Sequence, residues 1–288
     1  MKKTGEDLIH FFKMSGSGND FIAIDNRAKS IDADCCQNLV RSACRRKFSV
    51  GADGLILIEN DPECDFKWRF FNADGSEAEM CGNGARCAAR FALLQGIVTG
   101  PRMNFRTLAG IIEAEVSGER VKIRMPSPHS MELDFPLELE RKSFSFHSIN
   151  TGVPHAVTFL ENEDALRAMD VFRFGRAVRY HSRFQPAGSN ANFALVRDAH
   201  HMANRTYERG VEDETYACGT GTIASVLVAG AKGFVASPVE VETGGGEILT
   251  VYFSEMSHQE SLPFGEVRFE GSVKVVYAAD LWRETINE

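Results

Sequence analysis

The stretch 77–96, EAEMCGNGARCAARFALLQG, has a counterpart at 214–233, ETYACGTGTIASVLVAGAKG. Both contain the pattern C-G-x-G, beginning at Cys81 and Cys218, which are 218 − 81 = 137 residues apart. The same offset pairs Glu77 with Glu214, Ala92 with Ala229, Gly96 with Gly233, Val98 with Val235 and Pro101 with Pro238. Matches spread over this length at one offset indicate an internal duplication rather than a chance motif.

The segments before the two cysteines follow one order. At an offset shorter by one residue, Gly16 and Asn19 align with Gly152 and His155, ahead of an apolar strand in each half. The pattern predicts strands at 21–25, 54–59 and 67–71 in the first half and at 156–160, 191–197 and 204–208 in the second. An acidic loop and the C-G-x-G turn come next. Helices are then expected at 85–95 and 222–232, with Gly96 and Gly233 as left-handed C-terminal caps.

The two expected helices are unusually apolar, which predicts that each lies inside its sheet rather than on the surface of that sheet. The fold class expected is α/β (α+β), with two pseudo-symmetric domains from an internal duplication. Each domain is a mostly antiparallel sheet wrapped around a central helix, and the active site lies in the cleft between them. We expect the domains to be 1–126, completed by 271–288, and 127–270. The segment 126–146, with three prolines and mixed charge, marks the candidate boundary.

Composition places the chain among globular proteins, with 288 residues, 43% of them hydrophobic and 25% charged. A net charge of −8 without a basic run argues against nucleic acid and against an anionic membrane surface as partners. The first 21 residues lack the apolar core of a signal peptide, and the longest apolar run, near 223–231, is too short to span a bilayer. We therefore expect a cytoplasmic protein with reduced thiols.

The position of the duplicated cysteines indicates a chemistry. Each precedes a helix whose first amides and positive dipole end favour an anion and lower the pKa of a thiol. The flanking glycines let a substrate carboxylate approach those amides. Two thiols acting from opposite sides of one carbon suit proton removal on one face and proton delivery on the other, with inversion of the stereocentre. We therefore interpret Cys81 and Cys218 as an acid/base pair rather than as buried core residues.

Other functional interpretations of the cysteines and glycines have less support. The remaining cysteines, at 35, 36, 44, 64 and 87, show no C-x-x-C spacing, so no metal site is expected. The C-G-x-G turns lack the third glycine of a dinucleotide fingerprint, and no lysine near them would anchor pyridoxal phosphate. A Cys–His–Asn protease using His155 would leave the second cysteine and the duplication unexplained. We expect no cofactor.

Several segments together resemble diaminopimelate epimerases over the whole chain. They are KMSGSGNDFIAID at 13–25, GADGLILIE at 51–59, FNADGSEAEMCGNGARCAARF at 71–91, GVPHAV at 152–157, GSNANF at 188–193 and YERGVEDETYACGTG at 207–221. The resemblance implies cofactor-independent interconversion of LL- and meso-2,6-diaminopimelate in lysine and peptidoglycan biosynthesis. It also implies a homodimer with diaminopimelate as its small-molecule substrate.

The resemblance further implies roles for individual residues. Cys81 and Cys218 match the catalytic pair, and His155 and Glu208 match the residues thought to tune the two thiols. The substrate-binding residues implied are Asn19, Asn72, Gly82, Asn83, Asn190, Glu208, Arg209, Gly219 and Thr220. Of these, the helix-start residues would bind the reacting carboxylate. Asn72, Asn190 and Arg209 would hold the distal amino-acid end, for which arginine and asparagine are chemically suited.

Two positions depart from the family pattern. Val153 stands where many members have asparagine, and Gly54 stands where many have glutamine. The change at Val153 removes a side-chain donor from the distal carboxylate, and we expect backbone groups, Asn190 or Asn192 to replace it.

Three other functions remain open from the sequence. A two-cysteine enzyme acting on proline or hydroxyproline would have no use for Arg209 and Asn190 as distal anchors. A non-catalytic carboxylate-binding protein would not need both thiols. An isomerase with a carboxylate base would tolerate the loss of either cysteine.

Overall fold

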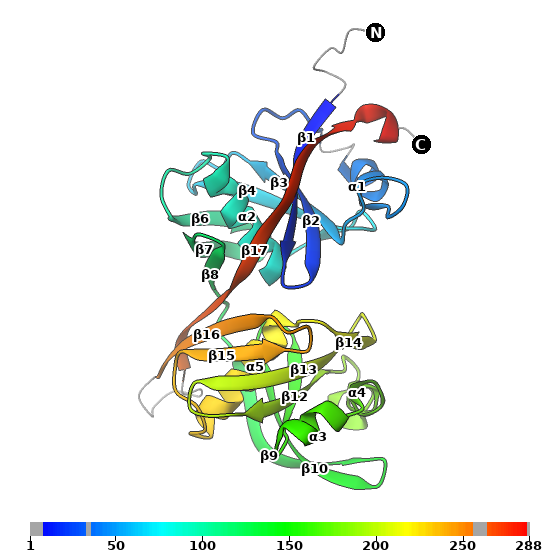
Figure 1. Cartoon of the computed structure of the whole chain (residues 1–288), viewed down its shortest axis with the longest axis vertical. Coiled ribbons are helices and arrows are strands. Elements are labelled where there is room, and N and C mark those ends of the chain that lie inside the picture. Colours follow the sequence, from blue (N-terminus) through cyan, green and yellow to red (C-terminus); the bar gives the residue numbers. More distant parts are fainter. Residues whose placement is uncertain (1–7, 33–35, 256–263, 287–288) are drawn as a thin grey trace. The chain divides into compact units, whose positions relative to one another are not determined.

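The chain forms two compact units, the first made of Met1–Ile123 with Gly271–Glu288 and the second of Arg124–Glu270. The computed structural model describes residues 8–32, 36–255 and 264–286 of these units (Figure 1). No helix of the described residues is long and apolar enough to cross a membrane.

The first unit is built mainly of strands. They are β1 (Leu8–Gly16), β2 (Asn19–Asp25), β3 (Gly54–Glu59), β4 (Phe66–Asn72), β5 (Glu77–Ala78), β6 (Arg102–Thr107), β7 (Gly110–Ser117), β8 (Arg120–Arg124) and the last part of β17 (Phe264–Trp282). Their spatial order is β17-β1-β2-β3-β4-β6-β7-β8, with the short β5 beside β4. The β2–β3 and β4–β6 pairs are parallel, and the others are antiparallel. Helix α1 (Cys36–Cys44) lies between β2 and β3 in the chain, and η4 (Arg283–Ile286) follows β17.

The second unit is also built mainly of strands. They are β9 (His129–Leu139), β10 (Lys142–Asn150), β11 (Pro154–Phe159), β12 (Asn190–Val196), β13 (His201–Glu208), β14 (Asp213–Thr215), β15 (Val239–Thr243), β16 (Ile248–Glu255) and the first part of β17. Their order is β9-β10-β11-β12-β13-β15-β16-β17, with the short β14 beside β13. Here β11–β12 and β13–β15 are the parallel pairs. Helices α3 (Glu163–Ala168) and α4 (Val171–Arg179) and the short η3 (Ser182–Phe184) connect β11 to β12.

The two units therefore share one topology, strand for strand, including the positions of both parallel pairs. This agreement confirms the duplication expected from the repeated C-G-x-G stretch. It also confirms the fold class: two related, sheet-dominated α+β units with few helices.

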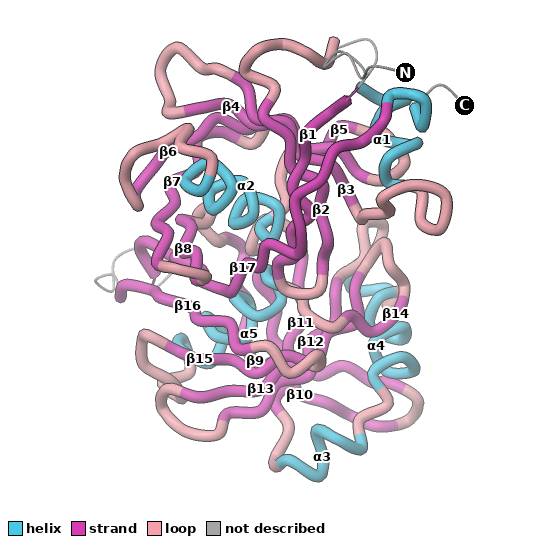
Figure 2. Tube along the Cα trace, turned by 45° about the horizontal axis from the view of Figure 1, so that its top comes forward, coloured by secondary structure: helices cyan, strands magenta, loops and turns pink. Residues whose placement is uncertain are grey.

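A central helix follows the short strand in each unit: α2 (Gly82–Leu94) and α5 (Gly219–Ala231). Helix α2 packs against β1, β2, β3 and β7, and α5 packs against β10–β13, β15 and β16. In Figures 1 and 2 each helix lies among the strands of its own unit. In α5 every residue from Gly221 to Ala229 is buried, as the apolar sequence predicts.

The helix ends explain why the chain turns where it does. Gly96 and Gly233 have φ of 64° and 71°, in the left-handed region expected of a C-terminal cap. Both helices start three residues earlier than predicted, directly after the cysteines, because the C-G-x-G turn itself forms the first helical turn.

Two other segments differ in local structure from what their sequence suggests, although the units divide between Ile123 and Arg124, close to the expected 126/127. The supposed acidic loops before the cysteines contain β5 and β14, which pair with β4 and β13. Most of the candidate boundary at 126–146 belongs to the β9–β10 hairpin of the second unit, in which Phe135, Leu137 and Leu139 are buried. Their side chains alternate with exposed neighbours along β9, so the segment is an ordinary strand despite Pro136.

Candidate active site

Cys81 is the N-cap residue of α2. Its backbone is extended, with φ −145° and ψ 115°, and its Sγ accepts a hydrogen bond from the Gly84 N–H at 3.4 Å. A Cβ added at Gly82 would meet no atom within 4 Å. The first turn of α2 therefore presents backbone to open space, as an anion site at a helix start requires.

A chain of polar side chains braces this turn. Asn83 Nδ2 donates to Asn19 Oδ1 at 2.8 Å, and Asn19 Nδ2 donates to Asp53 Oδ2 at 3.0 Å. The fully buried Arg86 donates to Asn83 Oδ1 at 2.6 Å and to Ser17 Oγ at 2.5 Å. The side chains of Asn19 and Asn83 thus hold each other, which leaves backbone amides as the groups that the turn offers to a ligand. Asp53 and Arg86 could not be predicted as site residues, because nothing in the sequence indicates that Asp53 contacts Asn19 or that Arg86 contacts Asn83.

Asn72 ends β4 and begins the turn into β5. Its Nδ2 donates to Ser76 Oγ at 3.1 Å, and its side chain is exposed. Its amide oxygen and second N–H can therefore bind a polar ligand group.

Cys218 occupies the equivalent N-cap position of α5, with φ −121° and ψ 107°. Its side chain is 7% exposed, and Sγ lies 3.6 Å from Thr220 Oγ1. The Cys218 carbonyl accepts from Thr222 through both its backbone N–H and its Oγ1, at 2.9 Å each. These bonds hold the start of α5 and the thiol in one geometry.

Burial, and after it the nearby Glu208 carboxylate, raise the pKa of the Cys218 thiol to about 12. The N–H groups of Thr220 and Gly221 act in the opposite direction, because they stabilise the thiolate. The expectation that the helix start would lower this pKa is therefore wrong for Cys218: loss of water outweighs the amides. The pKa of Glu208 is itself raised by burial. Cys218 is protonated at neutral pH, as a proton donor must be.

This pKa predicts how Cys218 responds to pH. Because only the thiolate reacts, the rate of Cys218 modification by methyl methanethiosulfonate should rise about tenfold per pH unit from pH 7 to 11. In Glu208→Gln the profile should move to lower pH, because the substitution removes a negative charge that raises the thiol pKa. Mass spectrometry of the Cys218 peptide measures both profiles. A plateau below pH 9 in the wild-type protein would contradict the prediction.

His155 lies beside Asn192 in a buried polar network. Its Nδ1 accepts from Asn192 Nδ2 at 3.1 Å, which places the imidazole proton on Nε2. Burial, and after it the Arg209 charge, lower the pKa of His155 to about 3, so the ring is neutral. Asn192 Oδ1 accepts from Thr206 Oγ1 at 2.9 Å. Among the described residues, Nε2 of His155 has no hydrogen-bond partner, although it is buried. It is a donor available to a bound group.

Asn190 and Arg209 are joined through the backbone. Asn190 Oδ1 accepts from the Arg209 N–H at 2.8 Å, and its Nδ2 donates to Pro154 O at 2.9 Å. The Arg209 guanidinium donates to Ala187 O at 3.1 Å. Asn190 therefore positions Arg209 and keeps one N–H for a ligand, while Arg209 keeps the rest of its donors.

The two departures from the family pattern have different consequences. A Cβ at Gly54 would lie 2.5 Å from Phe71 O and 2.6 Å from the Phe70 ring, so this backbone leaves no space for a longer side chain. Asn192 cannot replace the donor missing at Val153, because its Nδ2 already donates to His155 and to Ala156 O at 3.0 Å. Asn190, whose Nδ2 donates to Pro154 O, keeps its second N–H to donate.

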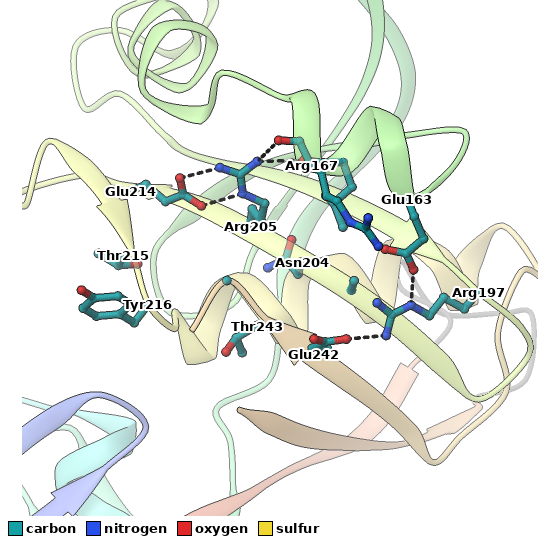
Figure 3. A pocket seen from close by; sticks show the side chains of 13 residues that line it. Glu163, Arg167, Arg197, Asn204, Arg205, Glu214, Thr215, Tyr216, Glu242 and Thr243 are labelled. Atoms are coloured by element: carbon teal, nitrogen blue, oxygen red, sulfur yellow. Dashed lines mark hydrogen bonds and ion pairs between the residues drawn. The ribbon is translucent and has the colours of Figure 1, made fainter. Parts of the chain in front are cut away.

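The second unit contains a cavity of about 930 Å³ whose lining includes Thr215 and Tyr216, just before Cys218 (Figure 3). Cys218 itself does not line it. Of the other cysteines, Cys36 and Cys44 lie at the two ends of α1, Cys64 precedes β4, and Cys87 is buried in α2; Cys35 lies outside the described residues. No group of three His, Cys, Asp or Glu side chains in the described part of the chain is arranged to hold a metal ion.

Solved structures resemble the fold of this chain at low sequence identity. A phenazine biosynthesis protein of the PhzF family from Bacillus anthracis matches with a TM-score of 0.74 and 16% identity, covering 98% of this chain and 99% of that one. A hydroxyproline epimerase from Agrobacterium vitis matches with a TM-score of 0.68 and 14% identity, covering 97% and 94%. At such identities the likeness shows the fold alone.

Sequence comparison is more specific. A family model described as diaminopimelate epimerase matches residues 11–130 and 147–269. The diaminopimelate epimerase of Aquifex aeolicus is 45% identical over 289 residues, covering 96% of this chain and 99% of that protein. That of Hydrogenobaculum sp. is 46% identical over 249 residues, covering 83% and 89%. The extent and level of these matches, over the same segments that carry both cysteine turns, show that the chain belongs to the diaminopimelate epimerase family, a family of isomerases.

Proposed function

We propose that this protein interconverts LL- and meso-2,6-diaminopimelate without a cofactor, in lysine and peptidoglycan biosynthesis, and that Cys81 and Cys218 are its acid/base pair. The observation that carries the mechanism is the equivalence of the two cysteines. Each is the N-cap of the central helix in its unit and follows the same short strand in the same topology. A duplicated core helix alone needs no cysteine at either start.

In the proposed reaction one cysteine, as thiolate, takes the proton from Cα, and the other, as thiol, donates a proton to the opposite face. The protonation of Cys218 at neutral pH supports its role as donor in one direction. The reverse reaction exchanges the two roles. The amides of Gly82, Asn83, Gly219 and Thr220 hold the reacting carboxylate and stabilise the negative charge that develops on it.

The distal end of the substrate carries an ammonium and a carboxylate. We assign the carboxylate to Arg209 and to the remaining N–H of Asn190, and we assign the exposed amide of Asn72 to the polar groups of the same end. Arg209 suits this role because its guanidinium can bind a carboxylate through two parallel hydrogen bonds. Proline and hydroxyproline have no such second amino-acid group.

His155 and Glu208 are proposed to adjust the thiols rather than to exchange the Cα proton. The buried Nε2–H of His155 can donate to a thiolate or to the substrate, which would satisfy a donor that is costly to leave unpaired. The negative charge of Glu208 adds to the effect of burial, which is the main cause of the raised pKa of Cys218. Asn19 is proposed to act indirectly, by holding the side chain of Asn83 through the hydrogen bond between them. We further predict that the protein forms a homodimer and is located in the cytoplasm.

The test is proton NMR of LL-diaminopimelate with the purified, reduced protein in D₂O, without added cofactor or metal. We expect one α-proton to exchange for deuterium while the meso isomer appears, because the donating thiol carries solvent deuterium. Parallel samples with L-proline and trans-4-hydroxy-L-proline should show no exchange. Exchange of these imino acids with none of diaminopimelate would favour the proline-type alternative. No exchange of any substrate by the folded protein would contradict the proposed activity.

A further inference from the structure

Each unit contains an arginine–glutamate pair in the same two-point geometry. Arg69 Nε and Nη2 donate to the two carboxylate oxygens of Glu77 at 2.8 and 3.0 Å. Arg205 Nε and Nη2 donate to those of Glu214 at 2.7 Å each. Both pairs are partly buried, with side-chain exposures of 17% and 30% in the first pair and 23% and 28% in the second. Bidentate pairs of this kind are stronger and more specific in geometry than ordinary surface ion pairs.

The two pairs occupy equivalent places in the sheets. Glu77 lies opposite Phe71 in the β4–β5 register, and Glu214 lies opposite Tyr207 in the β13–β14 register. The arginine comes two residues before the residue opposite its glutamate, so each pair is the same diagonal contact between neighbouring strands. Such a contact repeated in both units is a feature of the fold rather than a chance encounter of surface side chains.

The glutamates lie on the strands that lead to the cysteines. In both units the glutamate is four residues before the cysteine, Glu77 before Cys81 and Glu214 before Cys218. Strands β5 and β14 have only two and three residues, so few ladder hydrogen bonds hold them. A two-point ion pair is therefore a large share of what fixes the direction in which the chain enters each cysteine turn.

The third guanidinium nitrogen extends the contact to a helix. Arg205 Nη1 donates to Leu166 O at 2.7 Å and to Met169 O at 2.9 Å, at the end of α3. Arg69 Nη1 lies 3.7 Å from the Sγ of Cys36, the first residue of α1. In the first unit Arg69 thus links β5 to α1, which connects β2 to β3. In the second unit Arg205 links β14 to α3, which lies between β11 and β12 in the chain.

We propose that Arg69–Glu77 and Arg205–Glu214 are positioning residues for the acid/base cysteines, each holding the entry to one cysteine turn. This inference rests on the proposed roles of Cys81 and Cys218. Neither pair touches the substrate. Each acts by keeping the thiol and the first amides of its helix in the geometry that proton transfer requires, where an error of about 1 Å costs about a hundredfold in rate.

The test replaces each glutamate by its neutral isostere. We expect Glu77→Gln and Glu214→Gln each to lower kcat for diaminopimelate about 10- to 100-fold, with KM changed less than about threefold, because chemistry rather than binding loses its alignment. Hydrogen exchange should accelerate at residues 213–221 in Glu214→Gln and at 77–84 in Glu77→Gln, each without change in the other unit. Arg205→Lys, which keeps the charge but not the two-point geometry, should lower kcat less than Arg205→Ala does.

Glu163→Gln is the matched control. Glu163 pairs with Arg197 at 2.6 Å in the second unit and lines the same cavity as the Arg205–Glu214 pair, but it is not on the strand leading to Cys218 (Figure 3). Its kcat should stay within twofold of wild type. The Glu214→Gln protein should still fold, because the bond from the Gly245 N–H to Tyr216 O beside β14, 2.8 Å long in this structure, does not involve Glu214.

Three results would overturn the proposal: wild-type kcat in both glutamine variants, a rise in KM with kcat unchanged, or faster exchange throughout a unit, which would mean general destabilisation. The cysteine variants separate this failure from failure of the proposed function. If Cys81→Ser and Cys218→Ser lose activity while Glu77→Gln and Glu214→Gln keep it, only the positioning role fails. If the serine variants keep activity, the two-cysteine mechanism fails and the positioning role with it.

Discussion

Cys218→Ser and Cys81→Ser are each expected to lower kcat for diaminopimelate epimerisation about 10²- to 10⁴-fold. A serine hydroxyl is nearly the size of a thiol but is a far weaker acid, so the turn keeps its shape while proton transfer at one face of Cα is lost. The loss should be similar for the two variants, because inversion needs both a proton acceptor and a proton donor in either direction. Rates of conversion from LL to meso and from meso to LL, with circular dichroism to check the fold, measure it.

Cys64→Ser is the control for this pair of variants. Cys64 lies just before β4 (Phe66–Asn72), is partly exposed and is outside both cysteine turns. It should keep wild-type kcat, which would exclude a general requirement for thiols. Wild-type rates in either Cys81→Ser or Cys218→Ser would instead favour an isomerase with a carboxylate base, for which the half-buried Glu208 would be the first candidate.

Gly221→Ala is expected to have the second large effect. A Cβ at this position would lie 2.3 Å from Asn192 Oδ1, 3.2 Å from Thr206 Oγ1 and 3.3 Å from Cys218 Sγ. Asn192 cannot withdraw freely, because its Nδ2 donates to His155 and to Ala156 O. The added methyl must therefore push the start of α5 away from β12, or break the network through which Asn192 contacts His155.

The expected cost is about 1–3 kcal/mol in the free energy of unfolding, the usual cost of overpacking a core. Activity should fall by about a hundredfold, because the displaced helix start carries Cys218. Urea unfolding and kcat/KM measure the two effects. Gly100→Ala is the matched substitution, since a Cβ there would meet nothing within 4 Å and its backbone does not lie in the left-handed region. Equal behaviour of the two variants would contradict the steric argument.

Much of the fold could be predicted from the sequence, because the features concerned depend on residue type and on spacing along the chain. The repeat at an offset of 137 residues depends only on side-chain identity, and the αL caps at Gly96 and Gly233 depend on the freedom of glycine at positive φ. Apolar runs predicted the central helices and most strands within two or three residues. The short strands β5 and β14 could not be predicted, because a two- or three-residue strand has no periodicity and forms only where a partner strand is present.

Part of the candidate site could also be predicted from the sequence. Two cysteines in duplicated C-G-x-G turns indicated thiol chemistry at helix starts, and both are N-cap residues. The hydrogen bonds that orient the site residues could not be predicted from the sequence. Asn192 holds His155, and Asp53 holds Asn19, through contacts between residues about 35 positions apart.

By itself, then, the sequence determined the duplication, the central helices and the family, because these follow from residue type and spacing along the chain. Tertiary structure alone decided the ionisation of Cys218, whose pKa rises to about 12 because packing removes water from a thiol that the helix start would otherwise make more acidic. It also decided that Arg69 meets Glu77 and Arg205 meets Glu214, because only strand register places residues eight or nine positions apart on neighbouring strands. Burial and register are properties of the packed chain, and no stretch of residues carries them alone.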